Sequence, residues 1–238
     1  MRAVALLVAA LLAAGGALSP WSAKAQEVDL QLVLAIDISR SIDEEEARLQ
    51  REGYIAAFLS PQVHRAVASG RYGRIGVTYM EWAGTATQRV VVDWTLIDGP
   101  AAAKAFVGRL HVSPYMSASW TSISGAIDFA MALFDVSPFN GGRRVIDISG
   151  DGRNNQGRPA ADARDDAVRR GVTINGLPIT TDRPNFGRPA ERDLDLYYEK
   201  NVIGGPDAFL VVAESFQAFG QAIVSKLIKE IALLEAPR

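Results

Sequence analysis

Residues 32–45 read LVLAIDISRSIDEE. An almost unbroken apolar run, typical of a strand covered on both faces of a parallel sheet, ends in Asp37, and Ser39 and Ser41 follow at alternate positions. The strand would therefore deliver three oxygen-bearing side chains to one loop. Oxygen ligands suit a hard cation such as Mg²⁺, which takes about six of them in octahedral geometry. This D-x-S-x-S stretch predicts a divalent cation site.

The same stretch allows a second interpretation, in which Ser41 begins the helix that follows. Ser41 and Glu44 form the pattern of a capping box, in which a hydroxyl and a carboxylate satisfy free backbone N–H groups at a helix start. Capping does not explain Asp37 or Ser39, because a carboxylate at the end of a buried strand is costly without a partner. Both roles are compatible, with the cap fixing the loop that carries the ion.

The N-terminus has the pattern of a cleaved export signal. Arg2 supplies the charge, residues 3–18 are apolar, and Ala23 and Ala25 form a small-x-small cleavage site. The apolar run is shorter than the roughly 20 residues that a membrane-spanning helix needs. We therefore expect residues 1–25 to be removed, and the mature chain to be periplasmic or secreted with no stable membrane span.

Removing 25 of the 238 residues leaves 213 (26–238), a length that suits one domain with a substantial core. Loss of Arg2 and Lys24 changes the formal charge from −2 to −4, and this mildly acidic balance argues against nucleic acid as the main partner. The chain has no Cys, which excludes disulfides and thiolate metal sites. Its two His residues, His64 and His111, are far apart in sequence, so neither a zinc site nor a Ser-His-Asp triad is favoured.

Strands and helices alternate along this domain, which implies crossover connections and a Rossmann-like, doubly wound α/β fold. The sheet is expected to be mostly parallel, with helices on both faces. In such sheets the binding crevice lies beyond the carboxyl ends of the strands. Asp37, Thr121 and Asp151 each follow a strand or precede a helix, so we expect them to meet at that edge. Apolar patterns predict strands at 28–38, 74–82, 88–96, 144–149, 172–179 and 208–213, and helices at 42–59, 101–110, 123–134, 159–170 and 215–234.

At these residues the chain resembles the von Willebrand factor A-type domain, with its metal-ion-dependent adhesion site. The resemblance covers about residues 28–234. More narrowly, the pieces IDISGDGRNN and NVIGGPDAF resemble an uncharacterised family of exported bacterial A-type domain proteins. Three separated pieces carry the resemblance to the A-type domain: the D-x-S-x-S stretch, Thr121 followed by Ala126 and Ile127, and Asp151-Gly152 after an apolar strand.

The resemblance implies a metal-dependent binding module without enzymatic activity. A protein ligand would present a carboxylate to the open coordination position of the ion. Mg²⁺ is the expected ion, with Mn²⁺ or Ca²⁺ as alternatives. The residues that would contact the ion directly, contact it through water or support its ligands are Asp37, Ser39, Ser41, Thr121 and Asp151.

Two positions depart from the A-type pattern. Asp147 stands where an aliphatic residue is usual, and four strand residues at about 3.3 Å each would place it roughly 13 Å from Asp151. We therefore expect Asp147 to be a buried or edge carboxylate with a partner of its own rather than a metal ligand. Gly150 replaces the usual Thr, which removes a hydroxyl from the loop.

The polar segment 180–206 is longer than the connections of about 6 residues that are common in α/β domains. Because it follows a strand, it should emerge at the edge that carries the metal loops. Arg and Tyr are favoured at recognition surfaces, so Arg188, Arg192 and Tyr197 are candidate ligand-binding residues. The alternative is a short helix that covers the edge of the sheet.

Two tryptophans lie beside the pieces described above. Trp82 ends a predicted strand, and Trp120 directly precedes Thr121. Each side chain suits either the core or a recognition surface, and the core is favoured for Trp82.

Two other functions compete with a binding module. A phosphatase-like hydrolase would use Asp37 as its nucleophile, but Ser39 stands where that pattern needs a second Asp, and no Gly-x-Ser-x-Gly elbow occurs. A nucleotide-binding protein would need G-x-G-x-x-G or G-x-x-x-x-G-K-S/T after the first strand, and neither is present. The hydrolase remains the alternative function.

Overall fold

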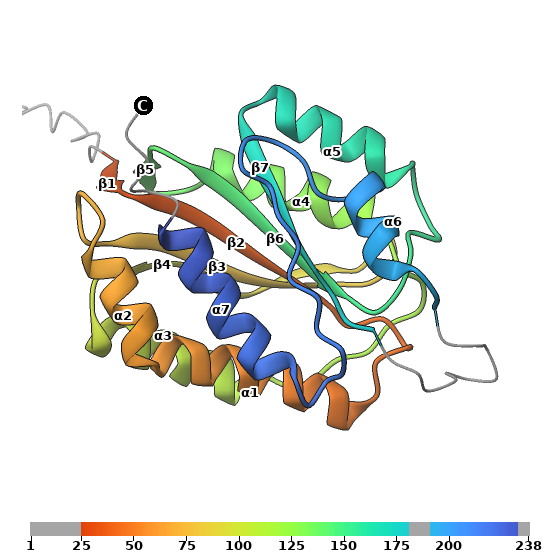
Figure 1. Cartoon of the computed structure of the whole chain (residues 1–238), viewed down its shortest axis with the longest axis horizontal. Helices are drawn as coiled ribbons and strands as arrows, with labels where there is room; N and C mark the ends of the chain where they lie inside the picture. Colours follow the sequence, from red (N-terminus) through yellow and green to blue (C-terminus); the bar gives the residue numbers. More distant parts are fainter. Residues whose placement is uncertain (1–24, 181–190, 233–238) are drawn as a thin grey trace, which may run out of the picture.

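The computed structural model of the chain describes residues 25–180 and 191–232. The predicted signal peptide, residues 1–25, lies outside the described residues except for Ala25, and so does Arg188. The described chain forms an α/β domain in which a central, mostly parallel sheet is flanked by helices on both faces (Figure 1). The predicted Rossmann-like fold class is confirmed.

The central sheet has the strand order β4-β3-β2-β6-β7, so β2 lies in the middle. Strands β2, β3, β6 and β7 run parallel, and β4 returns antiparallel beside β3. A second, two-stranded sheet pairs β1 with β5. The strands span Gln26–Val28 (β1), Leu30–Asp37 (β2), Ile75–Trp82 (β3), Gln88–Ile97 (β4), Phe139–Gly141 (β5), Arg144–Gly150 (β6) and Val172–Pro178 (β7).

Helices cover the sheet in two layers. One face carries α1, α2, α3 and α7, and the other carries α4, α5 and α6 (Figure 1). The helices span Glu44–Leu59 (α1), Pro61–Ala68 (α2), Pro100–Val112 (α3), Ile123–Asp135 (α4), Ala160–Arg169 (α5), Leu194–Asn201 (α6) and Phe219–Ala232 (α7).

The sequence of β2 explains why it occupies the centre. Leu30, Leu32 and Leu34 pack in the core beneath α1 and α7, while Val33 and Ala35 pack in the core beneath α4. All five side chains are fully buried. A strand that is apolar at successive positions needs cover on both faces, and the two helical layers provide it.

The predicted strand 208–213 is wrong, because the chain there forms only isolated bridges beside β7. The Gly176 N–H donates to the Phe209 carbonyl, and the Ala213 N–H donates to the Pro178 carbonyl. Pro178 has no N–H to donate in return, so the ladder is interrupted between these bonds. The segment therefore lies along the edge of β7 without becoming a continuous strand.

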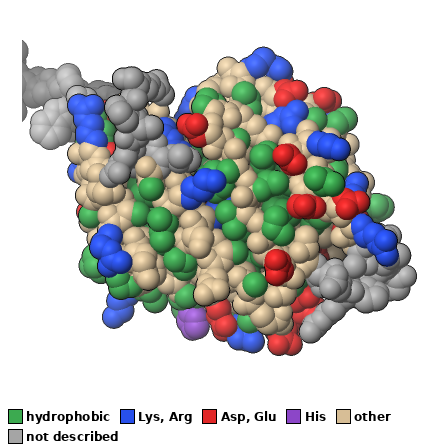
Figure 2. Space-filling model, in the orientation of Figure 1, with side chains coloured by type: hydrophobic (Ala, Val, Ile, Leu, Met, Phe, Trp, Pro, Cys, Tyr) green, Lys and Arg blue, Asp and Glu red, His purple; other side chains and the backbone are tan. Residues whose placement is uncertain are grey.

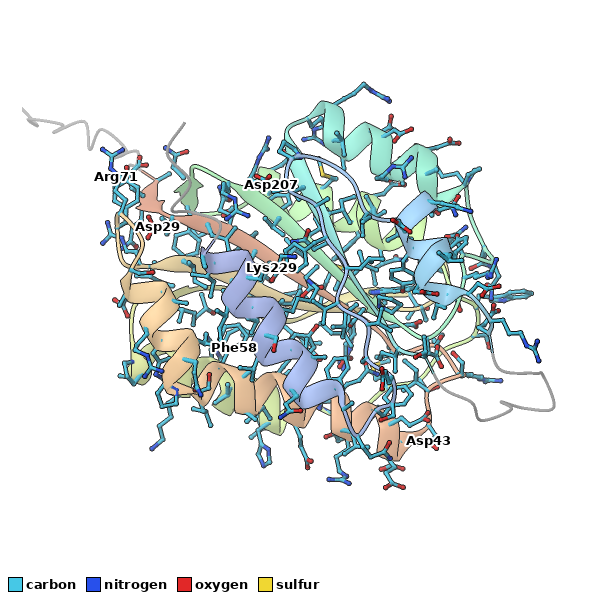
Figure 3. All side chains as sticks on the ribbon, viewed as in Figure 1. Asp29, Asp43, Phe58, Arg71, Asp207 and Lys229 are labelled. Atoms are coloured by element: carbon cyan, nitrogen blue, oxygen red, sulfur yellow. The ribbon has the colours of Figure 1, made fainter. Side chains whose placement is uncertain are left out.

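The parallel strands all end at the same side of the domain. Figure 3 labels Asp29, directly before β2, at one end of the sheet and Asp43, directly before α1, at the other. The loops after β2 and β6 therefore leave the sheet at the end where Asp43 lies, which is the edge predicted to carry the metal site.

The charge of the surface and the apolar character of the helices relate to the expected partners. Acidic and basic side chains are interspersed on the face shown in Figure 2. None of the helices in residues 25–180 and 191–232 has both the length and the apolar character needed to cross a membrane.

Candidate metal centre

Asp37, the last residue of β2, is fully buried. Its Oδ1 accepts a 2.7 Å hydrogen bond from the Ser39 N–H, whereas its Oδ2 has no hydrogen-bond partner among the described residues. Burial, and then the nearby Asp151, raise the pKa of Asp37 well above its ordinary value. A buried carboxylate oxygen without a partner is costly, so a further group such as a cation is expected beside Oδ2.

Ser39, Ser41 and Asp151 form one chain of hydrogen bonds. Ser39 Oγ lies 2.8 Å from Ser41 Oγ, and Ser41 Oγ donates a 2.6 Å hydrogen bond to Asp151 Oδ1. The chain joins the loop after β2 to the loop after β6. Burial raises the pKa of Asp151 to about 6, although the bond from Ser41 opposes this shift. The D-x-S-x-S stretch and Asp151 therefore come together.

The capping interpretation of Ser41 is wrong, because the capping box lies two residues further on. Asp43 Oδ1 accepts a 2.8 Å hydrogen bond from the Glu46 N–H, and Glu46 Oε2 accepts a 3.0 Å hydrogen bond from the Asp43 N–H. The Ile42 N–H donates to the Ser39 carbonyl, and this turn delays the start of α1. The Ser41 hydroxyl is thereby directed to the site instead of the helix end.

Thr121 lies in the loop between α3 and α4 and is held by Asn155. The Thr121 N–H donates a 2.8 Å hydrogen bond to Asn155 Oδ1, and the Asn155 N–H donates to the Thr121 carbonyl, also at 2.8 Å. Thr121 Oγ1 lies 3.7 Å from the position that a Cβ would take on Gly152. The Thr121 hydroxyl is therefore beside the loop that carries Asp151. Sequence reasoning missed Asn155, although the paired Asn residues that follow Asp-Gly after one Arg were a signal.

The donor set fits a hard cation. Within residues 25–180 and 191–232, no group of three or more His, Cys, Asp or Glu side chains is arranged to hold a metal ion. Hydroxyl groups from Ser and Thr would therefore have to complete a ligand set that contains only two carboxylates. An all-oxygen set of this kind suits Mg²⁺, Mn²⁺ or Ca²⁺ better than a metal that prefers nitrogen or sulfur.

The candidate ligand-binding residues lie near these loops where the structure describes them. Arg192 is exposed before α6, and its carbonyl accepts a 2.7 Å hydrogen bond from Arg153 of the loop after β6. Tyr197 is half-buried in α6, and its hydroxyl accepts a 3.2 Å hydrogen bond from the Asn154 N–H. Tyr197 thus braces the loop after β6, and α6 is the short helix expected as the alternative for this segment. Arg188 lies outside the described part of the chain.

The two tryptophans have different environments. Trp82 is fully buried at the end of β3, as favoured, whereas Trp120 is 60 % exposed directly before Thr121. Trp120 adopts a φ of +72°, a left-handed conformation that costs about 1–2 kcal/mol for a residue with a Cβ. A 2.8 Å hydrogen bond from the Ser122 N–H to the Ala83 carbonyl helps to hold the chain there. The indole of Trp120 is thereby exposed to solvent beside the candidate metal site.

A buried ion-pair network fixes the loop between α3 and α4. Glu81 of β3 accepts from Arg51 of α1 and from Arg89 of β4, each at 2.6 Å. Arg89 also donates a 2.8 Å hydrogen bond to the Pro114 carbonyl, and the Arg51 guanidinium lies 4.0 Å from the centre of the Tyr115 ring. The loop that leads to Thr121 is therefore held by α1, β3 and β4 together.

Asp147 is paired, as predicted, and its partner is Lys226 of α7. Lys226 Nζ lies 2.6 Å from Asp147 Oδ1 and also contacts Glu230. All three side chains are fully buried, and Asn175 of β7 donates a 3.1 Å hydrogen bond to Glu230. Burial raises the pKa of Asp147 to about 7 against the attraction of Lys226. This carboxylate belongs to the contact between the sheet and α7.

Solved structures with low sequence identity share the fold. The pilus adhesin SpaC from Lactobacillus rhamnosus GG is 13% identical, with a TM-score of 0.62 over 86% of this chain and 31% of the adhesin. A von Willebrand factor type A protein from Catenulispora acidiphila is 15% identical, with a TM-score of 0.55 over 87% of this chain and 43% of that protein. Proximal thread matrix protein 1 from the mussel byssus, with a zinc-occupied MIDAS motif, is 15% identical, with a TM-score of 0.57 over 87% of this chain and 46% of that protein.

The chain therefore has a von Willebrand factor A-type fold, and the predicted resemblance is confirmed. It spans about a third of the adhesin and under half of the other two proteins. Within this class, residues 27–235 match the family described as "Protein of unknown function (DUF1194)", and the chain belongs to that family. No curated protein is significantly similar to it in sequence.

Proposed function

We propose that this domain binds a protein partner by capturing a carboxylate through a divalent cation, without catalysing a reaction. The observation that carries the proposal is the meeting of two buried acids, Asp37 and Asp151, with the hydroxyls of Ser39 and Ser41. Such a set can hold Mg²⁺ and leave coordination positions for water and an outside ligand. Mn²⁺ and Ca²⁺ are the alternative ions.

The charge of the site favours an acidic partner. Asp37 and Asp151, once ionised, would balance the two positive charges of the ion, while Ser39, Ser41 and Thr121 would contribute neutral oxygen atoms. The bound ion would supply local positive charge at its open position, which attracts an anionic oxygen. A carboxylate from a partner protein meets this requirement.

Two of the similar structures support this proposal at the level of fold. The mussel protein has zinc in its MIDAS motif, and SpaC is described as a pilus adhesin. Shared fold alone does not transfer function, so the argument rests on the site of this chain. A phosphatase-like hydrolase at the same site has less support, because Ser39 takes the place of the second acid that such an enzyme needs.

Ligand choice is proposed to reside in the side chains around the ion. Trp120 presents a large aromatic surface beside Thr121, and exposed aromatic residues are favoured at binding surfaces. Arg192 and Tyr197 lie beside the loop after β6, and with Arg188 they are proposed to contact groups next to the captured carboxylate. The ion would attract any acid, whereas these side chains would distinguish one acid from another.

The location of the mature protein is also a proposal. Residues 1–25 would be removed as an export signal, leaving a periplasmic or secreted domain, 26–238, that begins at Gln26. The intact mass of the protein recovered from its native host tests the cleavage site. Recovery of a chain that retains residues 1–25 in a membrane fraction would contradict it.

Titration calorimetry with Mg²⁺ and Mn²⁺ tests the metal site, and capture from the native envelope fraction with and without chelator tests the binding function. We expect metal binding by the wild type, loss of binding in Asp37→Ala, and a partner retained only when metal is present. Asp93→Ala is the control, because Asp93 is exposed on β4. Turnover of generic phosphate or carboxyl esters by wild type but not by Asp37→Ala would favour the hydrolase instead.

A further inference from the structure

We infer that Tyr198, on α6, is a positioning residue of the metal centre, and that its hydroxyl holds the free carboxylate oxygen of Asp37. The inference rests on the proposed function, since it gives Tyr198 a role toward a bound cation. The D-x-S-x-S stretch and the Thr and Asp-Gly pieces do not include this residue.

Two buried oxygen atoms have no hydrogen-bond partner in the described chain, and both lie close to the backbone of Gly150. One is Asp37 Oδ2 and the other is the Tyr198 hydroxyl. A Cβ on Gly150 would lie 2.8 Å from Asp37 Oδ2 and 3.0 Å from the Tyr198 oxygen. One atom is an acceptor and the other carries a proton to donate, so one water bridging them would satisfy both. Buried polar atoms rarely stay unpaired, which makes this pairing the economical solution for both.

Two glycines on adjacent strands provide the space for the tyrosine. A Cβ on Gly176 of β7 would lie 2.9 Å from Tyr198 Cδ1, so the ring packs against the backbone of that strand. A Cβ on Gly150 of β6 would lie 3.0 Å from the hydroxyl at the end of the ring. Strand order places β2 next to β6 and β6 next to β7. The side chain thus extends from α6 across β7 and β6 to Asp37 at the end of β2.

This arrangement gives Gly150 a role. At this position the A-type pattern has a Thr, and Gly removes its hydroxyl from the loop. The Tyr198 oxygen lies beside the missing side chain and supplies a hydroxyl from another element. Asp37 would then be oriented at both oxygens, by the Ser39 N–H at Oδ1 and by Tyr198 at Oδ2. Each carboxylate oxygen has two lone pairs, so a hydrogen bond leaves room for the ion.

Tyr54, on α1, provides a matched control. It is also fully buried and its hydroxyl also lacks a hydrogen-bond partner in the described chain, but it packs in the core on the opposite face of the sheet from α6. Removing either hydroxyl by a Tyr→Phe substitution preserves the ring and its packing. The two variants therefore differ in whether the lost hydroxyl faces a proposed metal ligand.

The test is titration calorimetry of the wild type, Tyr198→Phe and Tyr54→Phe with Mn²⁺ and Mg²⁺, together with tyrosine ultraviolet difference spectra on metal addition. Loss of an outer hydrogen bond to a metal ligand typically costs 10–100-fold in metal affinity, and we expect a loss in that range for Tyr198→Phe. Tyr54→Phe should bind metal like the wild type. Metal should perturb the tyrosine spectrum of the wild type and of Tyr54→Phe, and much less that of Tyr198→Phe.

A folded Tyr198→Phe protein with wild-type metal affinity would overturn the inference. A Tyr198→Phe protein that loses the same stability with and without metal, with its affinity unchanged, would overturn it too. Gly150→Ala approaches the same contact from β6, because its methyl group would press on both oxygen atoms, and it should also weaken metal binding. A wild type that binds no metal would refute the proposed function itself, which is a different outcome from a Tyr198→Phe protein that binds normally.

Discussion

Ser41 Oγ donates a 2.6 Å hydrogen bond to Asp151 Oδ1 and so connects the loops that follow two adjacent parallel strands. The bond joins two protein groups directly, so it would help to hold these two loops in place for an ion. A site that is assembled in advance spends less of its binding free energy on ordering the chain. Ser41→Ala should therefore weaken metal binding even if the other oxygen ligands are intact.

Divalent cation should stabilise the fold through Asp37. At 100-fold excess over the dissociation constant, binding at one site contributes about 2.7 kcal/mol to the free energy of unfolding. Asp37→Ala should abolish this effect and should raise the stability of the metal-free protein, because it relieves the repulsion between Asp37 and Asp151. Thermal melts with Mg²⁺, Mn²⁺ or chelator test both effects, with Asp93→Ala as the control. Identical wild-type melts in all three conditions would count against the site.

Substitutions of Trp120 should separate ligand binding from stability. The φ of +72° suits Gly, so Trp120→Gly should be more stable than Trp120→Ala by about 1 kcal/mol, as measured by urea unfolding. Both variants should keep wild-type metal affinity and lose binding to the captured partner. If both bind the partner as well as the wild type does, Trp120 does not belong to the recognition surface.

Removing one partner of the buried network around Glu81 should strongly destabilise the fold. Glu81→Ala leaves Arg51 buried without its carboxylate partner, and such a loss typically costs about 3–5 kcal/mol of unfolding free energy. Glu52→Ala is the control, because it breaks an exposed pair with Arg48, and such pairs contribute little to stability. Urea unfolding in chelator measures both. Equal losses of unfolding free energy in the two variants would contradict this expectation.

Asp147→Asn should change how stability depends on pH. The pKa of Asp147 is raised to about 7 in the fold, so the folded protein keeps a proton that the unfolded chain releases above its ordinary pKa of 3.8. The stability from this group is therefore full below 3.8 and is lost as pH rises through 7. Relative to wild type, Asp147→Asn should be more stable at pH 8 than at pH 5. Urea unfolding in chelator at both values tests this, and an equal difference at both would contradict it.

The part of the site that could be predicted from the sequence is the part encoded locally. Asp37, Ser39 and Ser41 lie within five residues, and an apolar run marks the strand that delivers them. Asp151 follows a second such run. Because parallel strands end at one edge, the meeting of these two loops follows from the strand pattern alone.

The remaining contacts depend on distances that only the fold defines. The reach of Tyr198 to Asp37 requires Gly176 and Gly150 on adjacent strands, and nothing near Tyr198 in the sequence indicates either. The partner of Asp147 was equally hidden, although Lys226 falls on the apolar stripe of its helix, where a charged residue needs a buried partner. The capping box was misplaced because one turn of backbone, not composition, decides where α1 begins.

The segment 209–213 has a consequence for self-association. An uncovered outer strand presents a row of free N–H and C=O groups that can pair with another chain and start aggregation. Backbone bonds from this segment to Gly176 and Pro178 occupy that row on β7. At the opposite edge, β4 pairs with β3 through an irregular register and carries the exposed Asp93, and irregularity and charge both discourage intermolecular pairing. The sheet can therefore leave the loops at its carboxyl end exposed with little tendency to polymerise through its sides.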